Sequence, residues 1–142
     1  MLPMAVTSPQ DMKGDRMKYI DIQNDVMSKY KIKLDPFSSC RGRTHAHVKQ
    51  RRVCKLHQKN SISSTFDLLH EIGHCETTKG WMRRCEEEYH ATMWAIEKCN
   101  EYGLDVPDSI IDKYQKYINM EHDRGIRRGG NLPDVKDFSL RK

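Results

Sequence analysis

The sequence predicts an α+β protein that is mostly helical, with a small antiparallel β-sheet placed before its most informative helix. Two observations predict this class. Several long segments repeat apolar residues at helical spacing, and residues 44–48 alternate in the period of two that is typical of a half-buried strand. The 142 residues suffice for one modest core. We expect a single domain over residues 18–122, between a disordered leader or cloning remnant at residues 1–17 and a basic, irregular tail at residues 123–142.

The first expected element is an amphipathic helix over residues 19–31. Ile22, Val26 and Tyr30 recur every fourth residue and would form the buried face of this helix. The region ends at Asp35-Pro36, because a residue that precedes proline is disfavoured in the helical conformation.

Two short strands are expected next. In residues 44–48, small and apolar side chains alternate with His45 and His47, and residues 52–56 supply the second strand. Residues 49–51 would form the turn of a hairpin. We expect His45 and His47 to lie on the solvent-facing side.

Residues 65–74 have the clearest helical pattern. Phe66, Leu69 and Ile72 fall on one stripe, as in a helix that packs on a core. Three hydroxyl residues are candidates for its N-cap: Ser63, Ser64 and Thr65. Residues 75–80, with two threonines and a glycine, favour a turn after it.

Two further helices are expected. One runs from Trp81 or Met82 to Tyr102, and Gly103 is well placed to end it as the C′ residue. Its main apolar stripe is predicted to hold Tyr89, Met93, Ile96 and Asn100, with an adjoining stripe of Glu88, Ala91 and Ala95. The other starts near Pro107, since proline is favoured in the first turn of a helix.

Composition excludes some classes of function. No run of about 18 apolar residues is present, so the sequence predicts no membrane-spanning helix. Residues 1–10 lack the charged and apolar regions of a secretory signal. The five cysteines form no C-x-x-C pair, which argues against a disulfide framework and for a reducing, cytoplasmic location.

Charge is unevenly distributed along the chain. The net charge is +8 over residues 1–60, −6 over residues 61–121 and +3 over residues 122–142. An acidic middle segment would favour a bound cation. The basic flanks could contact nucleic acid, but we favour a solvated basic surface.

The acidic segment contains His70-Glu71-Ile72-Gly73-His74, which has the pattern H-E-x-x-H. Residues four apart lie on one face of a helix, so His70 and His74 can direct their imidazoles at one metal ion. Glu71 lies about 100° round the helix, where it can accept a proton from a metal-bound water as a general base. The alternative is an ordinary amphipathic helix that carries two histidines.

A catalytic zinc ion takes three protein ligands and leaves one position for water, so a third ligand is needed. Gly80 stands where an extended version of the motif would place a third histidine. Three adjacent acids on the next expected helix are the remaining candidates: Glu86, Glu87 and Glu88. We favour Glu88, because Ala91 and Ala95 in the following turns are small and would let the two helices approach closely.

These residues resemble the minimal metallopeptidase domain of the ImmA/IrrE type. That family joins H-E-x-x-H to a later E-x-x-A-x-x-(aromatic)-A segment, which residues 88–95 match as Glu-Tyr-His-Ala-Thr-Met-Trp-Ala. The resemblance covers roughly residues 40–100 and includes a short sheet before the motif helix. The chain departs from the family at residues 96–100, where Ile-Glu-Lys-Cys-Asn replaces an apolar segment, and we expect no fused helix-turn-helix domain.

The resemblance implies a zincin-like fold with one Zn²⁺ bound by His70, His74 and Glu88, and Glu71 as the catalytic base. Members of the family act on repressor or regulator proteins in bacteria and mobile elements. A further hydrogen-bond donor often assists such hydrolysis, and four residues are candidates: Tyr89, His90, His45 and His47.

The sequence therefore predicts a zinc-dependent metallopeptidase that hydrolyses a peptide bond in a specific protein, encoded by a phage or another mobile element. One alternative is a protease of the SprT-like kind, which acts on DNA-bound proteins through the basic flanks. A second alternative is a non-enzymatic, zinc-containing binding protein.

Overall fold

A computed structural model describes residues 18–35, 45–54 and 58–141. These ranges contain four α-helices, α1 (Tyr19–Lys29), α2 (Ile62–Thr77), α3 (Arg84–Glu101) and α4 (Asp108–Arg127). They also contain three short strands, β1 (Lys33–Asp35), β2 (His45–His47) and β3 (Arg52–Cys54), and a 3-10 helix, η4 (Val135–Phe138). The predicted α+β class is confirmed. The predictions made for residues 1–17, 44 and 55–56 lie outside the described residues.

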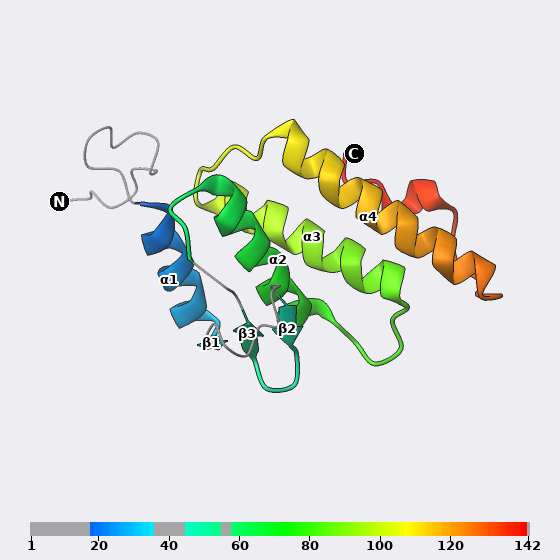
Figure 1. Ribbon diagram of the computed structural model, residues 1–142, viewed down its shortest axis with the longest axis horizontal. Helices are drawn as coiled ribbons and strands as arrows, with labels where there is room; N and C mark the ends of the chain where they lie inside the picture. The colour runs from blue at the N-terminus through cyan, green and yellow to red at the C-terminus, as the bar shows by residue number, and fades with distance from the viewer. Residues whose placement is uncertain (1–17, 36–44, 55–57, 142) are drawn as a thin grey trace.

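Helix α2 occupies the centre of the fold (Figure 1). Helix α1 and the sheet pack on one side of it, and α3 packs on the other side, followed by α4. The predicted stripe of Phe66, Leu69 and Ile72 is fully buried, and so is Leu68 between them. Because neighbours cover α2 on several sides, its side chains are held in fixed positions. None of the helices in the described chain is long and apolar enough to cross a membrane.

Helix α2 begins earlier than the sequence predicted. Its N-cap is Ser61, whose side-chain oxygen accepts a hydrogen bond from the backbone N–H of Ser64 at 3.1 Å. The hydroxyl of Thr65, one of the expected caps, donates instead to the Ser61 carbonyl at 2.8 Å. Four of the five residues 61–65 carry a hydroxyl group, and the propensity of the residues alone does not separate these possible caps.

The sheet is mixed, not purely antiparallel, with strand order β1-β3-β2. The predicted hairpin is confirmed over the described residues, since β2 and β3 pair antiparallel with His45 opposite Cys54. The strand that the sequence analysis missed is β1, which pairs parallel with β3. It has only three residues, too few for a period of two to be recognised. An ion pair between buried Asp35 and Arg52 joins these two strands.

Helix α3 turns its small side chains toward α2. Ala91 and Ala95 are fully buried, whereas Asn100, expected on the main apolar stripe, is exposed. The adjoining stripe that contains Glu88 is therefore the principal packing face. Gly103, with φ of +72°, adopts the left-handed conformation expected of the C′ residue.

The carboxyl-terminal segment is not irregular throughout. Helix α4 continues to Arg127, and η4 follows at Val135–Phe138. Phe138 and Leu140 are buried in the core, which the expected domain limit at residue 122 excluded. Two isolated apolar residues among basic ones give no periodic signal, so only the tertiary contacts reveal this packing.

The four cysteines that lie within the described residues are of two kinds. Cys75, Cys85 and Cys99 are buried free thiols, as expected of small apolar residues. Cys54 takes part in a disulfide bond, which the argument against a disulfide framework did not anticipate. The cysteines therefore give no support to a reducing compartment.

Helices α2 and α3 lie very close together at Gly73, inside the H-E-x-x-H motif. A Cβ atom added to Gly73 would lie 2.5 Å from the carbonyl oxygen and 3.0 Å from the Cα atom of Ala91. Both obstacles are backbone atoms of a packed helix, which cannot move aside cheaply. Gly73 and Ala91 together set the distance between the helix that carries the histidines and the helix that carries Glu88.

We expect Gly73→Ala to lower the free energy of unfolding by about 1–3 kcal/mol, because it overpacks this contact. Gly80→Ala is the matched control, since a Cβ atom there meets nothing within 4 Å, and its effect should stay within about 0.5 kcal/mol. Urea denaturation measures both changes. Equal stability of the two variants would contradict the close approach.

Candidate metal centre

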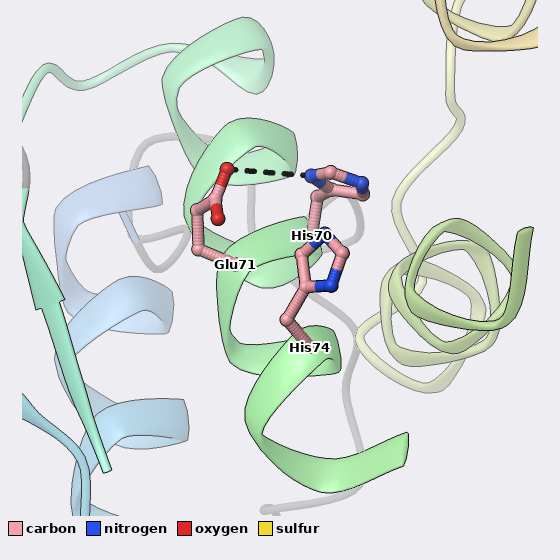
Figure 2. Close-up of side chains that lie close together, drawn as sticks. All are labelled: His70, Glu71 and His74. Atoms are coloured by element: carbon pink, nitrogen blue, oxygen red, sulfur yellow. Dashed lines mark ion pairs between the residues drawn. The ribbon is translucent and has the colours of Figure 1, made fainter. Parts of the chain in front are cut away.

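Helix α2 places the two motif histidines side by side beneath the surface. Their side chains point in the same direction from successive turns (Figure 2), and their ring centroids lie 4.7 Å apart. His70 is 4% exposed and His74 is 7% exposed. Imidazoles are seldom this buried without a partner, so the surroundings of their nitrogens decide what the pair can do.

The partner is Glu88, which α3 brings against both rings. Oε1 of Glu88 lies 3.0 Å from Nε2 of His70, and Oε2 lies 3.2 Å from Nε2 of His74. Glu88 itself is 1% exposed. The structure thus gathers two imidazole nitrogens and one carboxylate around a single point.

The two neighbouring acids on α3 take other roles. Glu86 accepts a hydrogen bond from the backbone N–H of Arg83 at 2.9 Å and so caps the helix. Glu87 lies 3.8 Å from a guanidinium nitrogen of Arg84. Of these three acids, all within the described residues, only Glu88 contacts the histidines.

Glu71 approaches His70 from the opposite side. Its carboxylate lies 3.5 Å from Nδ1 of His70, the contact that is dashed in Figure 2. His70, Glu71 and His74 also place ligand atoms within 4.8 Å of one another, so they form a second possible ligand set. We favour Glu88 as the ligand because its two oxygens reach the Nε2 atoms of both histidines, whereas the Glu71 carboxylate contacts the far nitrogen of one ring.

The charges in this cluster depend on one another. Burial by itself lowers the pKa of His70, but Glu71 and Glu88 outweigh it and raise that pKa to about 9. Burial by itself raises the pKa of Glu88, but its contacts with His70 and His74 outweigh burial and lower that pKa to about 2. In the absence of a metal ion, His70 is therefore a cation beside the Glu88 anion. The proton on His70 then supplies the positive charge that a bound metal ion would supply.

Three buried polar atoms of the cluster are poorly satisfied by hydrogen bonds. Among the described residues, neither nitrogen of His70 nor Oε1 of Glu88 has a hydrogen-bond partner of good geometry. A buried polar atom without a partner costs about 1–3 kcal/mol. Two imidazoles with one carboxylate, either that of Glu71 or that of Glu88, form a donor set that could hold a divalent metal ion.

A cavity of about 220 Å³ opens beside the cluster, between β2 and the two helices. His45, half-buried, lines this cavity, so the expectation that it faces solvent with His47 is wrong. His47 is exposed, as expected, and its Nε2 lies 3.9 Å from Asp35. The two histidines share one face of β2, with their ring centroids 4.9 Å apart, and the alternation of residues does not show which end of the strand lies nearer to α2.

The other two candidate donors lie elsewhere on α3. Tyr89 is buried with its ring 5.5 Å from that of Phe138, and His90 is exposed. Neither is among the residues that line the cavity in the described chain. His45 is therefore the only one of the four candidates that the described cavity wall includes.

Two residues near the histidines, Arg84 and Tyr114, were not predicted from the sequence. Arg84 lines the cavity, and its Nη2 lies 3.3 Å from Oε2 of Glu88. Its position four residues before Glu88 was a usable signal, since such residues meet on one helix face. Tyr114 of α4 packs its ring 4.7 Å from that of His70 and donates its hydroxyl hydrogen bond to Asp67. Both contacts of Tyr114 join distant parts of the chain, so no local sequence pattern predicts them.

No family model, curated protein or solved structure matches the chain. The function must therefore be inferred from the geometry and chemistry of the cluster, together with the motif residues of the sequence.

If Glu88 is the third ligand, Glu88→Gln should weaken Zn²⁺ binding by more than about 100-fold, because even partners outside the ligand shell cost 10- to 100-fold. Glu87→Gln removes the same charge from the adjacent position of the cavity wall and should change the affinity little. Competition with a chromophoric chelator measures both. A Glu71→Gln variant that lost zinc while Glu88→Gln kept it would show that the ligand set includes Glu71 instead.

Zinc binding should strengthen as the pH rises toward about 9, because the metal must displace the proton that Glu71 and Glu88 hold on His70. Below that pH, each bound ion should release about one proton from His70. Titration calorimetry in two buffers of different ionisation enthalpy counts the protons. A zinc affinity that does not change between pH 6 and 9 would exclude the displacement of a proton from His70.

Proposed function

We propose that this protein is a zinc-dependent metallopeptidase with a zincin-like fold. The observation that supports the proposal best is the meeting of one buried carboxylate, Glu88, with the Nε2 atoms of His70 and His74. Glu71 lies beside this cluster in the same cavity wall. The four residues have the chemical types and helix positions of a catalytic zinc site that keeps a place for water.

In this proposal His70, His74 and Glu88 hold the ion. A zinc ion in such a site supplies a bound water of lowered pKa and polarises a carbonyl oxygen. The Glu71 carboxylate, which lines the same cavity, would turn from Nδ1 of His70 to accept the proton of the attacking water and would return it to the leaving amine. Arg84 and His45 line the same cavity, so they are placed to donate hydrogen bonds to the peptide carbonyl.

The substrate proposed is a single kind of protein rather than polypeptides in general. The cavity beside the cluster, at about 220 Å³, has room for one or two side chains of such a substrate. The likeness of residues 88–95 to the ImmA/IrrE segment supports a regulator or repressor of a phage or mobile element as that protein.

Glu71→Gln tests the catalytic role. It should keep zinc at one ion per chain and lower the cleavage rate by at least about 100-fold, the usual contribution of a general base. A peptide library of random sequence, read by mass spectrometry before and after incubation, reports cleavage at any bond that the protein accepts. Glu97→Gln, which removes the same charge from an exposed position on α3, is the control and should cleave normally.

Two outcomes would contradict the proposal. Equal cleavage by Glu71→Gln and the unchanged protein would remove Glu71 from the mechanism. A zinc-loaded protein that cleaves nothing, while Glu71→Gln keeps its biological effect, would indicate a binding protein whose metal serves another purpose.

A further inference from the structure

A second cavity, of about 330 Å³, shares Arg84 with the cavity at the candidate metal centre. It is formed where the N-terminal end of α3 meets the C-terminal end of α4 and the loop that follows α4. Four arginines contribute to its wall: Arg83, Arg84, Arg124 and Arg128. Glu121 is the single acid among the described residues that line it.

Two of these guanidinium groups already have carboxylate partners. Arg84 lies 3.3 Å from Glu88, and Arg124 lies 3.3 Å from Glu121. The other two have none within the described residues. Arg83 donates to the carbonyl of Asn131 at 3.3 Å, and no hydrogen bond or ion pair is present for the Arg128 guanidinium in the described part of the chain. The cavity wall therefore carries two guanidinium groups, those of Arg83 and Arg128, that no carboxylate of the described residues neutralises.

Two glycines let the loop after α4 form one wall of this cavity. Gly129, with φ of +83°, turns the chain back as α4 ends. A Cβ atom on Gly130 would lie 2.7 Å from the Gly125 carbonyl and 3.0 Å from the Arg83 guanidinium. Because Gly130 has no side chain, the loop can lie against both α4 and Arg83 and so form one wall of the cavity.

The wall also has an apolar part. Leu132 and Cys85 contribute to it between the arginines. A cavity of this size takes one or two side chains but not the backbone of a nucleic-acid duplex. Guanidinium groups bind carboxylates through paired N–H donors, so the mixture suits an acidic side chain or a chain-terminal carboxylate attached to an apolar neighbour.

Arg84 connects this cavity with the metal centre, because its side chain lines both. We propose that the second cavity binds a carboxylate-bearing segment of the peptide substrate and so selects substrates with an acidic residue next to the cleaved bond. This proposal rests on the proposed peptidase function, because it assumes that the protein cleaves a peptide bond. The binding of the carboxylate itself does not depend on cleavage.

The test uses the full chain loaded with zinc and carrying Glu71→Gln, so that bound peptide is not consumed. Fluorescence anisotropy compares a labelled peptide that contains four glutamates with the same peptide containing four glutamines. The glutamate peptide should bind at least about tenfold more tightly, as expected of charge-assisted hydrogen bonds. Arg83→Glu and Arg128→Glu should each abolish this preference.

Arg127→Glu is the matched control, because Arg127 is exposed at the same end of α4 but does not line the cavity. It changes the net charge by the same amount and should leave the preference for glutamate intact. An equal loss in all three variants would show a diffuse attraction between charges and overturn the proposal. So would equal binding of the two peptides, or preferential binding of a labelled DNA duplex that all three variants weaken alike.

These results separate the two proposals. Selective binding of the glutamate peptide by a protein that never hydrolyses any peptide would contradict the peptidase function alone. Cleavage of peptides without regard to acidic residues, together with no selective binding, would contradict the carboxylate site alone.

Discussion

The contact on which the rest of the structure depends is that of one buried carboxylate with two buried imidazoles. Removing these groups from water is costly, and a charge left without its partner in such a place costs several kcal/mol. The surrounding fold keeps them together. Helix α2 is covered on several sides, the absent side chain of Gly73 lets α3 approach, and the ring of Tyr114 supports His70. A small shift of α3 would separate the carboxylate from both imidazoles.

Much of the fold could be predicted from the sequence because its signals are local. The buried stripe of α2, the hairpin of β2 and β3, and the end of α3 at Gly103 all follow from the spacing of neighbouring residues. Strand β1 could not be predicted, since three residues paired with a strand far along the chain carry no periodic signal. The packing of Phe138 likewise depends on contacts with distant helices.

In the candidate site, too, local features could be predicted from the sequence and contacts between distant elements could not. The small residues Ala91 and Ala95 correctly indicated which of three adjacent acids would contact the histidines, although the essential small residue on the facing helix, Gly73, was overlooked. Spacing on a single helix cannot reveal what another element contributes. His45 reaches the cavity only because β2 packs against α2, and no pattern within three residues shows that orientation.

Arg84 lines both cavities. Its guanidinium contacts the Glu88 carboxylate and also donates to the hydroxyl of Tyr117 on α4 at 3.1 Å, so it is held between α3 and α4. A substrate carboxylate bound beside it would lie near the metal centre without competing for the ion. The same side chain could thus relate the recognition of the substrate to the position of the bond to be cut.

The most direct test of the central claim is a crystal structure of the zinc-soaked protein with anomalous diffraction measured on both sides of the zinc absorption edge. The account predicts one ion at about 2.0–2.2 Å from Nε2 of His70, Nε2 of His74 and a carboxylate oxygen of Glu88, with Glu71 outside the ligand shell. An ion bound elsewhere, or the three side chains turned away from one another with no ion between them, would contradict it.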